Sequence, residues 1–109
     1  MAKAVLITGT VLTDPDREAE FNEWYDKIHI PDVLETPGFV KATRYTLAVP
    51  GQSGSRQAEY VTLYELDRGD LEQAEQDLQE THRRNRERGR FVDCFEVVHR
   101  GYYTSVSED

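Results

Sequence analysis

Three residues of one segment, Tyr25, Asp26 and His29, have the types and the spacing that acid–base chemistry needs. Helix positions three and four apart share a face, so the side chains of Tyr25 and Asp26 are expected beside that of His29. A histidine can transfer a proton near neutral pH, and a nearby carboxylate would orient its ring and favour the charged form. The segment therefore predicts a proton-transfer site in which Asp26 or Asp32 orients His29 and Tyr25 or Tyr45 donates a hydrogen bond to the substrate.

The same histidine also allows a simpler interpretation. Pro31 is expected to end the helix, because proline disfavours helical geometry in the residue before it. A histidine in the last turn can bind the final carbonyl groups and complement the helix dipole. From the residues alone, this capping role is slightly favoured over catalysis. Asp32 is expected either at the mouth of the pocket, as a further candidate catalytic carboxylate, or as an ordinary loop aspartate.

Aromatic side chains and a second histidine are the expected substrate contacts. Six tyrosines can line a pocket that is apolar but still hydrogen-bonds to a phenol, ketone or acid. They are also ordinary strand residues. His99 is expected on the same strand face as Phe95 and Val97, as a second acid–base group or, preferably, as a structural histidine. Trp24 continues the apolar stripe of its helix and is expected mainly in the core. The predicted substrate contacts are Trp24, Tyr45, Tyr64 and His99.

Six elements must position these residues. Hydrophobic periodicity predicts strands over 3–12, 39–48, 59–66 and 91–104. One helix is expected from an Asp14 N-cap to Pro31, and a second from an Asp70–Gln73 capping box to Gly89. Strict alternation places Phe39 and Tyr45 on one face of their strand and Arg44 on the other. The stretch 50–55, rich in Gly and Ser, is expected to be a loop.

The element order β-α-β-β-α-β predicts the fold. Right-handed crossovers convert this order into an α+β, ferredoxin-like domain over 1–109, a four-stranded antiparallel sheet with two helices on one face. The predicted strands carry large residues on both faces, so the open sheet face needs a cover. A second copy of the same sheet is the simplest cover, and a homodimer is therefore expected.

Charge and composition exclude several classes of partner. Thirteen Lys and Arg against 21 Asp and Glu give a net charge of −8, which disfavours nucleic acids and anionic membranes. No apolar stretch approaches the ~20 residues needed to span a bilayer, and no signal peptide is recognisable, so a cytoplasmic protein is expected. Cys94 is the only cysteine, and motifs for metals, phosphates, flavins or nicotinamides are lacking. No cofactor and no metal are therefore expected, and the basic block 83–90 is expected to be solvated.

The stretch from Phe21 to Phe39 resembles the EthD-like branch of the dimeric α/β-barrel superfamily. The shared features are an aromatic pair, a histidine, a proline and a Pro-Gly before the next strand: Trp24-Tyr25, His29, Pro31 and Pro37-Gly38, followed by Arg44-Tyr45. The resemblance implies two ferredoxin-like subunits whose sheets pair into a barrel, with a pocket between sheet and helices in each. The matching histidine is His29, so the resemblance favours a pocket role over capping.

The resemblance also sets the expected function. Its relatives include cofactor-free cyclases, dehydratases, decarboxylases, isomerases and monooxygenases of polyketide and aromatic metabolism, and some haem proteins. We expect a small cofactor-independent lyase or isomerase, of the cyclase, dehydratase or isomerase type, acting on an aromatic or polyketide-like small molecule. The alternatives are a non-catalytic, ligand-binding or stress-responsive dimer, a cofactor-free monooxygenase, and a haem protein with His29 or His99 as axial ligand.

Overall fold

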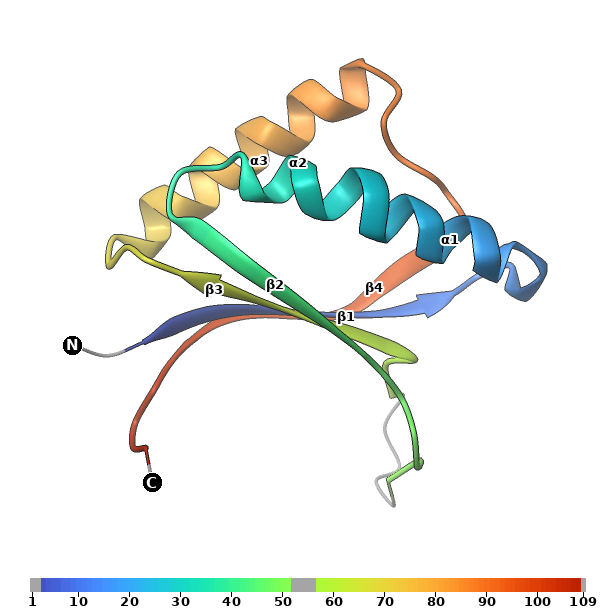
Figure 1. Ribbon diagram of the computed structural model, residues 1–109, viewed down its shortest axis with the longest axis horizontal. Coiled ribbons are helices and arrows are strands. Elements are labelled where there is room, and N and C mark those ends of the chain that lie inside the picture. Colours follow the sequence, from blue (N-terminus) through green and yellow to red (C-terminus); the bar gives the residue numbers. More distant parts are fainter. Residues whose placement is uncertain (1–2, 52–56, 109) are drawn as a thin grey trace.

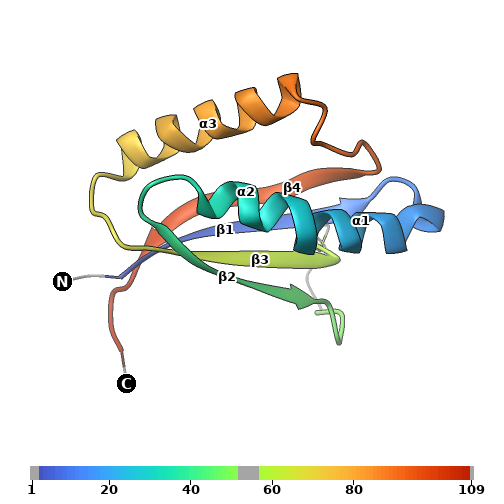
Figure 2. The same ribbon diagram turned by 45° about the horizontal axis from the view of Figure 1, so that its top comes forward.

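One four-stranded antiparallel sheet carries two helical segments on a single face (Figures 1 and 2). The computed structural model describes residues 3–51 and 57–108. The strands are β1 (Ala4–Leu12), β2 (Phe39–Thr46), β3 (Tyr60–Leu66) and β4 (Phe95–Thr104). Their order in the sheet is β2-β3-β1-β4, and all neighbours are antiparallel. The predicted α+β, ferredoxin-like fold is confirmed, while residues 52–55 of the expected loop lie outside the described residues.

The first helical segment is longer than predicted because Pro31 does not end it. Its four contiguous parts are η1 (Pro15–Arg17), α1 (Glu18–Trp24), the π-helical turn η2 (Tyr25–His29) and α2 (Ile30–Leu34). Asp14 caps its start as predicted, accepting a hydrogen bond from the Asp16 N–H at 3.1 Å. In the π turn the Ile30 N–H donates to the Tyr25 carbonyl, five residues back. This wider turn, directly before Pro31, accommodates the proline ring within the helix.

The second helix, α3 (Leu71–Glu87), ends near Gly89 as predicted, and Gly89 has a φ of 69°. Its predicted capping box is wrong. Asp70 occupies the N-cap position, but both of its carboxylate oxygens accept hydrogen bonds from Arg68, at 2.7 and 2.8 Å. Gln73 donates its side-chain amide to Asp77 instead. A charge-assisted bidentate pair is a stronger interaction for this carboxylate than a backbone N–H.

Two β-bulges reverse the side-chain alternation that the sequence predicts. In β2 the register shifts between Phe39 and Lys41, so Phe39 is buried towards the helices while Tyr45 lies on the open face. In β4 the register shifts opposite Gly9 and Thr10, which pair with His99 and Val97 respectively. A bulge inserts one extra residue, so the residues beyond it point to the opposite face. The faces assigned to Tyr45 and His99 were therefore wrong.

The core between sheet and helices consists of two clusters of buried side chains. The first joins the sheet to α2 and α3, and its central members are Leu6, Val33, Tyr64 and Leu78. The second surrounds the start of the long helix and contains Phe21, Trp24, Tyr25 and Cys94. Within the described residues, no helix combines the length and the apolar character needed to cross a membrane.

Candidate active site

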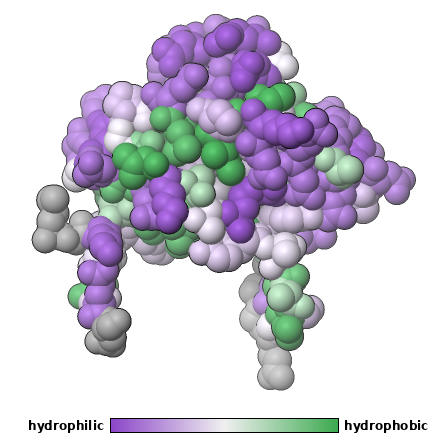
Figure 3. Space-filling model, viewed as in Figure 1, coloured by the Kyte–Doolittle hydropathy of each residue, from purple (hydrophilic) through white to green (hydrophobic). Residues whose placement is uncertain are grey.

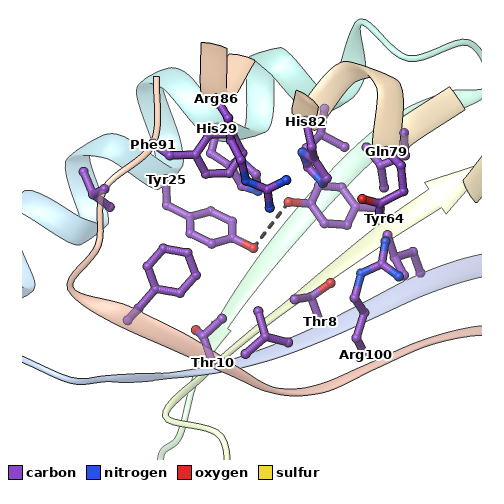
Figure 4. A pocket seen from close by; sticks show the side chains of 16 residues that line it. Thr8, Thr10, Tyr25, His29, Tyr64, Gln79, His82, Arg86, Phe91 and Arg100 are labelled. Atoms are coloured by element: carbon purple, nitrogen blue, oxygen red, sulfur yellow. Dashed lines mark hydrogen bonds between the residues drawn. The ribbon is translucent and has the colours of Figure 1, made fainter. Parts of the chain in front are cut away.

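A cavity of about 430 Å³ lies between the helices and the sheet, where the two core clusters meet (Figure 4). This volume is within the range of small-molecule pockets. Its walls come from β1, η2, α2, β3, α3, β4 and the chain that leads into β4. The residues of this lining that carry polar groups are Thr8, Thr10, Tyr25, His29, Tyr64, Gln79, His82, Arg86 and Arg100.

Two histidines stack against each other in the wall of this cavity. The rings of His29 from η2 and His82 from α3 are 5.5 Å apart between centroids and inclined by only 14°. Trp24 stacks on His29 with centroids 4.6 Å apart, and Phe91 approaches both imidazoles edge-on. The imidazoles are thus held in a mainly aromatic surrounding that fixes the planes of both rings.

Both imidazoles are neutral at physiological pH. Burial, with smaller contributions from the facing His82 and from Arg44 and Arg86, lowers the pKa of His29 to about 3. Burial and the positive charges of Arg86 and Arg100 lower the pKa of His82 to about 4. A carboxylate or a helix C-terminus, either of which would favour a charged His29, is not among the causes that set its pKa. The capping role is wrong, since the helix continues past His29 to Leu34.

Two tyrosine hydroxyl groups meet at the same cavity. The Tyr64 hydroxyl donates to that of Tyr25 at 3.4 Å, as the dashed line in Figure 4 shows. Burial and the neighbouring Tyr25 raise the pKa of Tyr64 well above its ordinary value. The phenol of Tyr64 therefore keeps its proton and can donate it in a hydrogen bond.

Arginines give the cavity a positive potential. Arg86 lies over the ring of Phe91, 5.0 Å from its centroid, and its guanidinium reaches from α3 towards the tyrosine hydroxyls (Figure 4). Arg100 enters from β4 and forms two hydrogen bonds with Glu75, at 2.7 and 2.8 Å. Within the described part of the chain, no aspartate or glutamate lines the cavity. A ligand with negative charge is favoured by this arrangement.

The two candidate carboxylates, Asp26 and Asp32, are held by arginines outside the cavity. Asp26 accepts a hydrogen bond from Arg44 at 3.0 Å, and Arg44 lies over the ring of Tyr25 at 4.5 Å. Asp32 forms a bidentate pair with Arg90, at 2.8 and 2.9 Å. Because the helix continues through Pro31, Asp32 projects from its side and is no loop residue at a pocket mouth. The expectation that either carboxylate orients His29 is therefore corrected.

The four predicted substrate contacts lie in different parts of the molecule, and only one of them lines the cavity. Tyr64 lines the cavity. Trp24 is buried behind His29, and its indole N–H donates to the Arg90 carbonyl at 2.7 Å. Tyr45 is 55% exposed on the open sheet face. His99 also lies on that face, with its Nε2 3.0 Å from the Tyr103 hydroxyl. The two β-bulges, which strict alternation ignores, account for the misplacement of Tyr45 and His99.

Sequence reasoning missed His82 and Arg86. Leu78, His82 and Arg86 follow one another at four-residue spacing and thus form a stripe along the cavity side of α3. The apolar spacing of Leu71, Ala74 and Leu78 allows His82 as a surface or helix-packing residue from the sequence alone, and one further turn would have found Arg86. Arg86 lines the cavity, whereas Arg83 of the same basic block pairs with Glu80 and Glu87 on the surface.

Among the described residues, no three or more His, Cys, Asp or Glu side chains lie together in a group that could hold a metal ion.

Solved structures with the same fold cover nearly the whole chain. HapK from Hahella chejuensis has a TM-score of 0.62 at 12% identity, covering 97% of this chain and 95% of that one. An ethyl tert-butyl ether D (EthD) family protein from Bacillus halodurans C-125 has a TM-score of 0.56 at 16% identity, covering 93% and 97%. SnoaB, a cofactor-independent oxygenase from Streptomyces nogalater, has a TM-score of 0.59 at 14% identity, covering 99% and 97%. At these identities the likeness shows the fold alone.

Sequence comparison is more specific than these structural likenesses. No curated protein sequence matches the chain. One family model does, and it covers residues 5–95, from β1 to the start of β4. Its match includes the whole π turn and the α3 stripe that form the cavity. The chain therefore belongs to the family described as "Domain of unknown function (DUF4286)".

Proposed function

We propose that the protein is an enzyme that binds an aromatic or polyketide-like small molecule in this cavity and uses His29 to move a proton. The observation that carries the proposal is the neutral imidazole of His29, which faces a cavity with apolar walls and hydroxyl and guanidinium groups at one side. A neutral imidazole has a free lone pair and can accept a proton, whereas a charged one cannot.

The groups around His29 suit the charge that proton removal creates. When a C–H or O–H next to a carbonyl or aromatic ring loses its proton, negative charge develops on the substrate oxygen. The hydroxyls of Tyr25 and Tyr64 and the guanidinium of Arg86 are the donors that would stabilise this oxyanion. The anion in turn offsets the repulsion from Arg44 and Arg86, a smaller contribution to the lowered pKa of His29 than burial, and so helps the imidazole hold the proton.

The deprotonated substrate has two chemical fates. In a cyclase, dehydratase or isomerase, the carbanion forms a carbon–carbon bond, expels water or is protonated elsewhere. In an oxygenase, it passes its electrons to O₂, and a methylene is converted to a ketone as R₂CH₂ + O₂ → R₂CO + H₂O. The shared fold of SnoaB, a cofactor-independent oxygenase, supports the second fate. Both begin with the same proton transfer.

A non-catalytic ligand-binding role is less consistent with the cavity. A sealed apolar cavity with His29 turned outwards would have favoured simple binding. Instead His29 and His82 both line the cavity, together with Arg86 and Arg100. Two buried imidazoles with strongly lowered pKa values at one cavity are typical of a functional site.

Hydrogen–deuterium exchange tests the proton transfer. The probe is 1-phenylbutane-1,3-dione in D₂O, with loss of its C2 proton signal followed by NMR in the presence of the wild type, His29→Ala or His99→Ala. Loss of His29 is expected to slow the exchange by about 100-fold or more, the usual contribution of a general base. His99→Ala is the matched control, since His99 lies on the open sheet face.

Equal exchange rates for the wild type and His29→Ala would overturn the proposal. His29→Asn, which keeps a planar polar group in the aromatic stack, guards against loss of folding, and circular dichroism checks both variants. An oxygen electrode then separates the two fates. Uptake of O₂ with an enolisable aromatic ketone supports the oxygenase, and His29-dependent turnover without uptake supports the lyase or isomerase.

A further inference from the structure

The charges around the cavity differ from those of the chain as a whole. The protein carries a net charge of −8, yet the described residues that line the cavity include two arginines, two histidines and no carboxylate. Such a local reversal of sign concentrates anions at the cavity and repels cations. The reversal depends on which of the arginine charges are already neutralised.

Of the two arginines, Arg86 is the one whose charge is available. Arg100 is held by both oxygens of Glu75, which also accepts a hydrogen bond from Tyr102. Within the described residues, no carboxylate lies within ion-pair distance of Arg86, whose guanidinium instead packs on Phe91. Packing on an aromatic ring fixes the plane of a guanidinium and leaves its N–H edge free for a bidentate acceptor.

The surroundings of Arg86 match one end of an aromatic acid. Its guanidinium reaches towards the paired hydroxyls of Tyr25 and Tyr64, while His82 lies on the same face of α3 (Figure 4). These groups all offer hydrogen-bond donors. The same lining includes the apolar side chains of Leu6, Val33, Phe95 and Val97. The cavity thus offers donors for an oxyanion and apolar walls for a flat hydrocarbon skeleton.

We infer that the cavity selects anionic aromatic ligands, and that Arg86 is the specificity-determining residue that binds their carboxylate or enolate oxygens. This inference deepens the proposed function, because it assigns the charge of the substrate to the same site. It also gives Arg86 a binding role that does not require it to transfer a proton. A neutral ligand of the same shape leaves the guanidinium partly desolvated and without an acceptor, and is therefore rejected.

Matched probes test this selectivity. Calorimetry and saturation-transfer NMR compare 2-naphthoate with the isosteric neutral 2-naphthamide and with the cationic 2-naphthylmethylammonium. For the wild type at neutral pH, naphthoate is expected to bind about tenfold or more tightly than naphthamide, as a charge-assisted hydrogen bond provides. Arg86→Gln is expected to abolish this preference, and Arg86→Lys to retain part of it.

Arg84→Gln is the matched control, because it removes the same charge from the same helix at a position outside the cavity lining. Equal losses in Arg84→Gln and Arg86→Gln would assign the preference to the general surface potential and overturn the inference. So would equal binding of the amide, tighter binding of the cation, or no naphthoate binding at millimolar concentration.

Failure of this inference and failure of the proposed function give different results. If exchange of the diketone proton depends on His29 but naphthoate and naphthamide bind equally, the function holds and the anion selectivity falls. If the preference for naphthoate depends on Arg86 but proton exchange does not depend on His29, the cavity is an anion-binding site without the proposed catalysis.

Discussion

Two residues, His29 and His82, show how the cavity is maintained at the expense of stability. Each imidazole is kept neutral by burial and nearby arginines, with a pKa of about 3 for His29 and about 4 for His82. In the unfolded chain a histidine titrates near its ordinary value of about 6.5. Below that pH the unfolded chain binds protons that the folded chain does not, and acid therefore favours unfolding.

The free energy of unfolding is accordingly expected to be highest above pH 6.5 and to fall as the pH is lowered towards 4. Each histidine contributes a slope of up to about 1.4 kcal/mol per pH unit in this window. Carboxylates with lowered pKa values, such as Asp70, stabilise the fold in this window, and their contribution is lost only as the pH falls from about 3.8 towards about 2. Urea titrations between pH 5 and 7, at one protein concentration, measure the slope.

The variant His82→Gln should lose about half of this pH dependence. His99→Gln, a substitution on the open sheet face, should retain the wild-type slope. If His82→Gln has an unchanged slope, the stacked histidines are not the groups responsible.

Among the elements, the π turn η2 determines which side chains of the first helix face the cavity. It places Tyr25 and His29 at the cavity and lets the helix continue through Pro31 into α2. π turns are uncommon and occur often at functional sites, where the additional residue redirects side chains. An ordinary α-helix over the same residues would meet the ring of Pro31 with the carbonyl four residues back.

Deleting Lys27, an exposed residue of the turn, is expected to convert η2 into an α-helical turn. The proline then lies in a regular helix, and the free energy of unfolding should fall by about 3 kcal/mol. Replacing Pro31 by Ala should restore most of this loss in the deletion variant. The same replacement should change the wild type by less than about 1 kcal/mol, since the π turn already accommodates the ring. Urea denaturation of the wild type, the deletion variant, Pro31→Ala and the combined variant measures these changes in the free energy of unfolding. If Pro31→Ala has the same effect in the wild type and in the deletion variant, the π turn is not what accommodates the proline ring.

The same elements show how far the sequence alone can predict this molecule. Strand order, the Asp14 cap and the helix end at Gly89 follow from local patterns, and the structure confirms them. The proximity of Tyr25 and His29 was also predictable, because it arises within one helix. The pairing of His29 with His82 was not, since it depends on how α3 packs against η2. Bulges likewise depend on the partner strand, and two of them displaced Tyr45 and His99 from the predicted site.

At the scale of the whole molecule, the sheet has one covered and one open face. Both helical segments lie on the same side in Figure 1, while the end of β2 and the segment after β4 extend beyond the sheet on the other side. In Figure 3 apolar residues gather over α2 and at the end of β2. The open face itself carries Val5, Ile7, Val61, Leu63, Tyr45 and Tyr103. Apolar side chains in the two central strands are seldom left to solvent.

We propose that a second copy of the chain covers this face. The patch crosses all four strands and is continuous, so two copies related by a twofold axis would bury the same residues on each side. The segment that follows β2, where Leu47 is 42% and Val49 80% exposed, would pack against the partner's sheet. Pairing also stabilises a small domain that buries only part of its apolar surface alone.

Sedimentation equilibrium is expected to give twice the chain mass at micromolar concentration. Tyr45→Glu places a charge on the open apolar face and should shift the protein to monomers, because burying an unpaired carboxylate costs several kcal/mol. Lys27→Glu, which changes an exposed residue of the helical layer, is the control and should remain dimeric.

The cavity lies on the opposite side of the sheet and is complete within one chain, so monomeric Tyr45→Glu should still bind naphthoate. A monomeric wild type would show that the open face is not a dimer interface, and a Tyr45→Glu dimer would place the interface elsewhere.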